Sequence, residues 1–473
     1  MPLVLGVDSS TQSTKVEVRD ADTGAVVAEG RAPHPPTTPP RSEQDPRAWW
    51  EALGRALAAA GEHADLRAVA AVAVAAQQHG LVVLDAHGEV VRPAKLWNDT
   101  ESAADAAWLI GRLGGPDAWA GACGTVPVAA LTITKLSWLH RSEPDAWARL
   151  ARVCLPHDWL TYRLTGEHVT DRGDASGTGW FSPAEGRYRL DLLAIVDAGA
   201  DWEPRLPRVL APEAVAGITH LTGGPALVAP GTGDNMAAAL GVALAPGDVA
   251  VSIGTSGTVF AVSDRPTADA TGAVAGFADA TGRHLPLVCT LNATKVTDAV
   301  ARLLGVDHAR LDALALDAEP GARGLVLVPY LDGERVPDRP DATGTLTGIR
   351  ADVTRADLAR AAFEGVVCGL LDGLDALAAA GVPTGGRLVL LGGGARSGAY
   401  RQVLADCSAR PVVVPAGAEH VAAGACVQAA AVLHGRPVAE VAAAWAPRAA
   451  TVVEPRRCDA SGLRARFRAV AHG

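Results

Sequence analysis

Two hairpin-like patterns far apart in the chain share one order of strand, Ser/Thr/Gly turn and strand. The first covers residues 3–19 and the second residues 248–262, roughly 244 residues further on. Leu3 to Asp8 is a short apolar run typical of a strand buried on both faces, and Thr14 to Arg19 alternates as a half-buried strand does. The repeat predicts a duplicated α/β protein, with one domain at 1–245 and the other at 246–473.

Composition narrows the class of ligand. The chain has 473 residues, of which 49% are hydrophobic and 20% charged, so it is long enough for more than one buried core. Its net charge of −10 argues against nucleic acid as a partner and favours a small ligand whose negative charge is met locally by backbone amides and metal. Only four of the 42 basic residues are lysines, a bias that we attribute to codon composition.

The cysteines and the N-terminus indicate the cellular compartment of the protein. Seven cysteines are scattered along the chain without a CxxC pair or metal-ligand spacing, which predicts reduced thiols in a cytoplasmic protein. The N-terminus enters a strand without a basic leader, and the Ala-rich stretch at 56–76 carries charges. We therefore expect neither a signal peptide nor a membrane span.

The candidate catalytic base is Asp234, in the stretch Pro230 to Gly241. Glycines there allow a tight turn close to a ligand, and Asp234 opens the helix that follows. Free N–H groups and the helix dipole are expected to keep this carboxylate ionised, with a low pKa. The alternative is an ordinary helix cap after a glycine turn.

A candidate phosphate and metal cradle follows the first strand. Asp8 ends the strand, and the hydroxyl-rich turn Ser9 to Ser13 comes next. Backbone N–H groups and hydroxyls can face phosphate oxygens, while a carboxylate can hold Mg²⁺ directly or through water. The alternative is that Asp8 only begins a turn.

Candidate ligands for sugar hydroxyls follow two further strand-like segments. Ala68 to Ala75 predicts a buried strand with Gln78 and His79 at its carboxyl end, where ligands bind in open α/β sheets. An amide and an imidazole both donate and accept hydrogen bonds. Trp97, in Leu96 to Asp99, adds an aromatic plate. A structural histidine and a core tryptophan are the alternatives.

Two glycine-rich segments differ in their predicted roles. Residues 170–179 are so rich in Gly and polar side chains that we expect a surface insertion shaping a substrate pocket, within a largely helical region from 100 to 220. Residues 392–397 follow a buried strand, and their bare backbone can lie against a base or ribose. Neither a Walker A nor a Rossmann fingerprint occurs.

Taken together, these stretches resemble the FGGY carbohydrate kinases, of the actin, heat-shock chaperone ATPase and hexokinase superfamily, over essentially the whole chain. Asp8 to Thr14 is similar to the family's first phosphate motif, although Ser10 stands where glycine is more usual. Gly254 to Gly257 is similar to the second phosphate motif, Gly392 to Ser397 to the adenosine motif, and Gly231 to Asn235 to the catalytic-base segment. The resemblance implies two actin-like (ribonuclease-H-like) domains with a nucleotide and sugar cleft between them.

Within the family, several stretches are similar to the members that phosphorylate D-xylulose: 41–50, 78–80, 96–99 and 174–178. The resemblance implies transfer of phosphate from ATP to D-xylulose, giving D-xylulose 5-phosphate in D-xylose catabolism, with Mg²⁺ as cofactor and a possible homodimer. It implies that Asp234 is the base and that Asp234 and Asp8 are metal ligands. The implied contacts to the sugar are Gln78, His79, Trp97, Asp234 and Asn235. The implied ATP and phosphate contacts are Asp8, Thr11, Ser13, Thr14, Gly254, Thr255, Ser256, Gly393 and Gly394.

Two alternatives stay open at this point. One is an FGGY kinase for another ketose or polyol, because an amide and an imidazole do not encode the configuration at each carbon. The other is a nucleotide-dependent conformational switch or sensor, as in the actin and chaperone branches of the superfamily.

Overall fold

The computed structural model describes residues 2–417 and 419–472, and the chain divides into two compact units. Unit 1 comprises Met1–Ala243, Asp264–Leu285 and Glu419–Pro447, and unit 2 comprises Leu244–Ser263, Pro286–Ala418 and Arg448–Gly473. Two segments from the second half of the sequence therefore pack with the first unit. The division into domains 1–245 and 246–473 stays a prediction.

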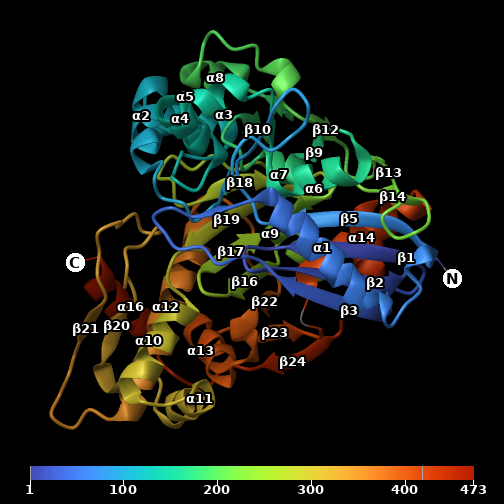
Figure 1. The fold of residues 1–473 in the computed structure, drawn as a ribbon. Coiled ribbons are helices and arrows are strands. Elements are labelled where there is room, and N and C mark those ends of the chain that lie inside the picture. The colour runs from blue at the N-terminus through green and yellow to red at the C-terminus, as the bar shows by residue number, and fades with distance from the viewer. Residues whose placement is uncertain (1, 418, 473) are drawn as a thin grey trace. The chain divides into compact units, whose positions relative to one another are not determined.

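The sheet of unit 1 contains the first predicted hairpin. Its strands run in the order β13-β14-β5-β1-β2-β3. β1 to β3 are antiparallel neighbours, whereas β5 lies parallel to β1 and β14 lies parallel to β5. The bounds are β1 Leu3–Ser9, β2 Ser13–Asp20, β3 Val26–Pro33, β5 Val69–Ala76, β13 Gly217–Thr219 and β14 Ala226–Val228. The carboxyl ends of β1 and β5 therefore lie side by side, which brings Asp8 next to the Gln78 segment (Figure 1).

Helices cover both faces of this sheet. A Cβ on Gly30 of β3 would collide with Ala56 of α1 (Pro46–Gly61), and one on Gly6 of β1 would collide with Ala422 of α14 (His420–His434). The two glycines pair with neighbouring residues of β2, whose side chains point to opposite faces. α1 and α14 therefore pack closely on opposite faces, and α14, drawn in red, lies beside β1 and β5 in Figure 1.

The middle region of unit 1 is helical and irregular, as predicted, and has an apolar core of its own around Leu109, Trp119 and Leu136. Two of its helices are α4 and α6. The other elements of unit 1, together with these two, are η1 Leu66–Ala68, β4 Glu43–Gln44, β6 Val82–Leu84, β7 Ala94–Lys95, α2 Ala103–Leu113, α3 Pro116–Cys123, α4 Thr132–Ser142, α5 Pro144–Arg149, β8 Arg152–Cys154, α6 Pro156–Thr165, β9 Val169–Asp171, α7 Arg172–Ala175, β10 Phe181–Ser182, β11 Arg187–Tyr188, α8 Leu190–Val196, η2 Glu203–Arg205, β12 Arg208–Leu210, β15 Thr232–Gly233, α9 Asp234–Gly241, β18 Ala275–Ala278 and α15 Val438–Ala444.

The expectation that 170–179 is a surface insertion was wrong, because all of this segment except Arg172 is buried. Most of its polar groups have hydrogen-bond partners. The Asp171 carboxylate accepts from the backbone N–H groups of Gly173 and Asp174 at 2.8 and 2.9 Å. The Ser176 hydroxyl donates to the carbonyl of Gly173 and accepts from the N–H of Ala278 at 3.0 Å. Satisfied polar groups can be buried at little cost.

Unit 2 repeats the hairpin topology of unit 1, which confirms the duplication. β16 (Val249–Ile253) pairs antiparallel with β17 (Gly257–Ala261) and parallel with β22 (Leu388–Leu391), as β1 pairs with β2 and β5. Beyond them, β19 adjoins β17, while β23 and β24 follow β22. The other elements are β19 His284–Thr290, which begins in unit 1, α10 Thr294–Leu304, α11 His308–Asp317, η3 Ala322–Gly324, β20 Val326–Val328, β21 Thr345–Thr347, α12 Arg355–Ala379, η4 Gly393–Arg396, α13 Gly398–Ser408, β23 Val412–Pro415, β24 Ala449–Val453 and α16 Ala460–Ala471.

Two further expectations can be compared with the structure. All seven cysteines are free; five are buried and two, Cys289 and Cys458, are partly buried. Within residues 2–417 and 419–472, none of the helices combines the length and the apolar character needed to cross a lipid bilayer.

Candidate functional site

Asp234 lies at the start of α9, directly after the short strand β15. β15 pairs with β5 at Ala75 and Ala76, so the turn before Asp234 is fixed beside the carboxyl end of β5. Gly233 is the helix cap, and Asp234 is the first helical residue. Its Oδ1 accepts from the backbone N–H and the Nδ2 of Asn235, at 2.8 and 2.9 Å. These bonds leave Oδ2 as the oxygen that can take a proton from a ligand.

The pKa of Asp234 differs from the expectation of a low value. Burial, and next to it the charges of Asp8 and Asp174, together raise this pKa to about 7, while the bonds from Asn235 act in the opposite direction. Burial and the two other carboxylates therefore outweigh the helix terminus. A carboxyl group with a pKa near neutrality is well matched to accept a proton at physiological pH.

Activity should therefore fall on acidification below pH about 7. Asp234 accepts a proton only when ionised, so its pKa in the protein with ATP and Mg²⁺ bound, at or below the value of about 7, sets the acidic limb of kcat/KM for the acceptor. We expect a decline approaching tenfold per pH unit well below this pKa. The check is a pH profile of ADP release, with return of full activity at pH about 8 after acid exposure as the control for unfolding. A flat profile down to pH about 5.5 would contradict this role.

Gln78 and His79 follow β5 and lie near Asp234. The Nδ2 of Asn235 donates to Oε1 of Gln78 at 2.9 Å, so the predicted amide joins the catalytic segment directly. His79 adopts a left-handed backbone conformation with φ of 67°, which is uncommon for a residue with a side chain. Its Nδ1 lies 2.9 Å from the carbonyl of Gly177, and since a carbonyl only accepts, Nδ1 carries the proton. In the neutral ring, Nε2 is then an acceptor for a hydroxyl.

Two neighbours fix the His79 ring. The ring of Phe277, from the segment 264–285 of unit 1, lies 5.4 Å from it between centroids. In addition, a Cβ added to Gly177 would lie 2.5 Å from both Cε1 and Nδ1 of His79. The imidazole is thus in contact with an aromatic ring and with bare backbone at its Nδ1 edge.

Replacing Gly177 with alanine should displace the His79 ring. We expect KM for the acceptor to rise by about tenfold or more, because a misplacement of about 1 Å weakens an oriented contact strongly. Steady-state kinetics with the acceptor varied measures this. Gly111→Ala in α2 is the matched control, because a Cβ there meets no atom within 4 Å. An unchanged KM in Gly177→Ala would contradict the assigned position of His79.

Asp8 is buried at the end of β1, where Lys15 compensates its charge. Lys15 Nζ lies 3.4 Å from Asp8 Oδ2 and also contacts Glu419, while Ser10 donates to Oδ1. Burial raises the pKa of Asp8, although Lys15 and Ser10 lower it. Lys15 was not among the predicted site residues, because the alternating pattern of its strand gave it no special role. The rarity of lysine in this Arg-rich chain was the available signal.

The hydroxyls of the first turn have protein partners. The Thr11 hydroxyl donates to Oε1 of Gln77 at 3.2 Å and accepts from Nε1 of Trp97 at 2.9 Å, which ties the tryptophan to the turn. The Thr14 hydroxyl is fully buried and lies 2.8 Å from Nε2 of His34. Ser13 is buried at the start of β2. Phosphate contacts by Thr11, Ser13 and Thr14 stay predictions.

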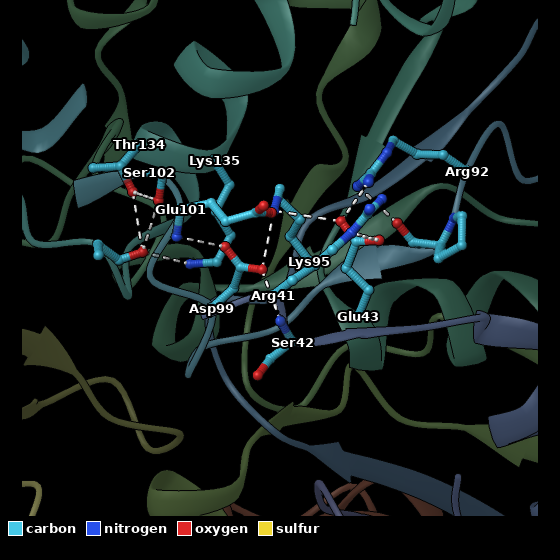
Figure 2. Close-up of polar contacts among 12 residues, drawn as sticks. Arg41, Ser42, Glu43, Arg92, Lys95, Asp99, Glu101, Ser102, Thr134 and Lys135 are labelled. Atoms are coloured by element: carbon cyan, nitrogen blue, oxygen red, sulfur yellow. Dashed lines mark hydrogen bonds and ion pairs between the residues drawn. The ribbon is translucent and has the colours of Figure 1, made fainter. Parts of the chain in front are cut away.

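The short strand β7, which precedes the turn that carries Trp97, is anchored by a buried lysine (Figure 2). Lys95 is fully buried, with its Nζ 3.3 Å from Glu43, 2.9 Å from Asp99 and in contact with Glu101. These three carboxylates are close enough to hold a metal ion, but the ammonium group already pairs with all of them. This network gives the stretches Arg41 to Asp45 and Leu96 to Asp99 a structural role: they hold β4 against β7, directly before Trp97 in the sequence.

The remaining predicted residues lie in unit 2. The N–H of Gly254 donates to the carbonyl of Ser256 at 2.9 Å, which forms the turn between β16 and β17. A Cβ on Gly394 would lie 2.5 Å from Cγ2 of Ile253, so the triple-glycine segment packs directly on the end of β16. Unit 2 therefore brings Gly254, Thr255 and Ser256 close to Gly393 and Gly394, as the two predicted nucleotide motifs require.

Comparison with known proteins decides the family. The model of the FGGY family of carbohydrate kinases, N-terminal domain, matches residues 3–241, and that of the C-terminal domain matches residues 249–433. The chain belongs to the FGGY family of carbohydrate kinases. It has the two-domain actin-like ATPase fold of these kinases.

Individual FGGY kinases match over nearly the whole chain. A xylulose kinase of Streptomyces coelicolor is 50% identical over 467 residues, which are 98% of this chain and 94% of the relative. A xylulose kinase of Streptomyces rubiginosus is 50% identical over 96% of this chain and 92% of its own length. The crystal structure of xylulose kinase from Bifidobacterium adolescentis has a TM-score of 0.87 at 42% identity and covers 100% of this chain and 99% of the other.

Proposed function

We propose that this FGGY kinase transfers the terminal phosphoryl group of ATP to the 5-hydroxyl of D-xylulose, giving D-xylulose 5-phosphate in D-xylose catabolism. The observation that carries the proposal is the 50% identity to xylulose kinases over nearly the full length. The site in unit 1 supports the proposal, because it brings together a proton acceptor, two amides and an imidazole. These are the side chains of Asp234, Asn235, Gln78 and His79.

The proposed roles follow from the contacts of each side chain. Phosphoryl transfer needs positioning and charge neutralisation more than covalent catalysis. Oδ2 of Asp234 accepts the proton of the 5-hydroxyl, while Oδ1 stays bonded to Asn235. Asn235, Gln78 and His79 bind the other hydroxyls of the sugar, and Trp97 covers an apolar face.

Asp8 and Asp234 fit a divalent cation. Both are acidic groups whose pKa values are raised by burial, and the charge of Asp8 raises the pKa of Asp234. A cation would relieve this repulsion, and carboxylate oxygens are the ligands that Mg²⁺ prefers. Bound Mg²⁺ supplies charge neutralisation for the phosphates of ATP.

The residues proposed for ATP are Asp8, Thr11, Ser13 and Thr14 of the first hairpin, Gly254, Thr255 and Ser256 of the second, and Gly393 and Gly394 for the adenosine. Lys15 joins this set as the counter-charge of Asp8. A cytoplasmic location stays a prediction, and a homodimer is one form that the protein could take.

The test is ADP release with Mg²⁺ and ATP across D-xylulose, D-ribulose, L-ribulose, L-xylulose, D-fructose and glycerol. We expect D-xylulose to give the highest kcat/KM. A higher value with another acceptor would overturn the assigned substrate while leaving the family assignment intact. Sugar-independent ATP hydrolysis as the main reaction would overturn the kinase proposal.

A further inference from the structure

A buried cluster of charged side chains near Gln78 has no role in the proposed reaction. His157 of α6 and Asp174 of α7 are both fully buried, and His157 Nδ1 lies 2.7 Å from Asp174 Oδ2. Nε2 of the same ring lies 3.2 Å from Asp158. Burial lowers the pKa of His157, but the surrounding carboxylates outweigh it and raise this pKa to about 9. His157 therefore donates to Asp174 and holds one of its two oxygens.

The second oxygen of Asp174 lies in the same buried region as the Gln78 amide. α7, which carries Asp174, packs against β15, and Gly233 of β15 lies directly against the Gln78 side chain. In the part of the chain that the structure describes, Asp174 Oδ1 and Gln78 Nε2 are buried and have no partner in full hydrogen-bond geometry. Burial raises the pKa of Asp174 while His157 and Gln78, as donors, lower it, which agrees with this placement. Bare backbone confines the amide, since a Cβ on Gly233 would lie 2.7 Å from Cγ and 3.1 Å from Nε2 of Gln78.

We propose that Asp174, held by His157, orients the Gln78 amide, and that this orientation fixes Asn235 against Asp234 for phosphoryl transfer. Asp174 and His157 are thus positioning residues, and the inference rests on the proposed function. The direction follows from hydrogen-bond chemistry. An ionised carboxylate only accepts, so it selects the Nε2 end of the Gln78 amide and turns Oε1 towards Asn235.

The orientation of the Gln78 amide then fixes that of Asn235. Oε1 of Gln78 can only accept, so Asn235 must present Nδ2, which it does at 2.9 Å. The same Nδ2 donates to Oδ1 of Asp234, also at 2.9 Å. Each amide therefore has one allowed orientation, and Oδ2 of Asp234 is left for the acceptor hydroxyl. A neutral amide at position 174 would permit both orientations of Gln78.

The variant Asp174→Asn tests this directly because it keeps the shape and removes the acceptor-only character. The introduced amide can still accept from His157 through its oxygen, but its nitrogen then turns a donor towards Gln78. We expect kcat/KM for D-xylulose to fall by between about tenfold and a hundredfold, with a raised KM for the sugar and an unchanged KM for ATP. A purely structural role would lower the active fraction without changing either KM.

A second substitution should restore the direction of the hydrogen bond between positions 174 and 78. In Gln78→Glu, two carboxylates face each other, and we expect activity and melting temperature to fall. In Gln78→Glu/Asp174→Asn, the amide introduced at position 174 donates to one oxygen of the carboxylate introduced at position 78. The other oxygen of that carboxylate again accepts from Asn235. The double variant should be several-fold more active than Gln78→Glu and should melt at a higher temperature.

Each outcome decides the proposal. Retention of kcat/KM within about twofold in Asp174→Asn would overturn it. If Asp174→Asn does not fold, the comparison of Gln78→Glu with the double variant still tests the proposal. A double variant that is no more active than Gln78→Glu, or is less stable, would show that the side chains at positions 78 and 174 do not face each other. Wild-type turnover of D-xylulose in the same assay tests the proposed function separately, so failure there is distinguishable from failure here.

Discussion

Replacing Asp234 with asparagine is expected to lower kcat with D-xylulose by between about a hundredfold and ten-thousandfold, the range for loss of a general base. Asparagine keeps the size of the side chain but cannot take the proton of the 5-hydroxyl. ADP release at saturating sugar and ATP measures the loss. The fold should survive, because the raised pKa of Asp234 shows that its ionised form is disfavoured in the folded protein.

The stability of this variant supplies its control. A carboxyl group whose folded-state pKa lies above the unfolded value opposes folding once the pH exceeds the unfolded pKa, and most strongly above the folded one. At pH about 8, Asp234→Asn should therefore melt no lower than the wild-type protein. A large loss of activity with an unchanged or higher melting temperature indicates a catalytic role. Retention of activity within about tenfold would exclude Asp234 as the base.

Replacing Lys95 with methionine is expected to lower the free energy of unfolding by about 3–5 kcal/mol, the cost of breaking a buried ion pair by removing one partner. Methionine preserves much of the volume but leaves Glu43, Asp99 and Glu101 without their shared cation, and it removes the ammonium group 3.9 Å from the Trp138 ring. Denaturant unfolding measures the change.

The matched control is Arg67→Met. Arg67 pairs with Asp65 at 2.9 Å, but its side chain is 76% exposed, whereas that of Lys95 is 0% exposed. Exposed pairs are screened by solvent and contribute little to stability, so this variant should be nearly as stable as wild type. Equal losses in the two variants would contradict the buried network as the anchor of β7 and of the Trp97 turn that follows it.

The sequence predicted those parts of the fold and site that depend on local pattern. Apolar runs identified β1 and β5, and the parallel pairing of these strands placed Asp8 close to the Gln78 segment, as the strand-end rule implies. The turn before Asp234 was equally local, since glycine and an acidic residue at a helix start can be identified directly in the sequence. The repeated hairpin predicted the duplication.

Contacts between distant segments could not be predicted in this way. The pKa of Asp234 depends on Asp8 and Asp174, which no local pattern connects to it. The second carboxylate paired with Lys15 is Glu419, 404 residues further on, in a segment that packs with unit 1. Residues 170–179 looked like a loop because composition does not show that their polar groups satisfy one another.

The central claim is transfer of phosphate to the 5-hydroxyl of D-xylulose, and identification of the product tests it most directly. After incubation of the protein with Mg²⁺, ATP and D-xylulose, phosphorus NMR of the mixture shows which carbon carries the new ester. The account predicts a phosphate ester coupled to the protons on carbon 5, formed in equal amount to ADP. An ester on another carbon, or inorganic phosphate without any sugar ester, would contradict it.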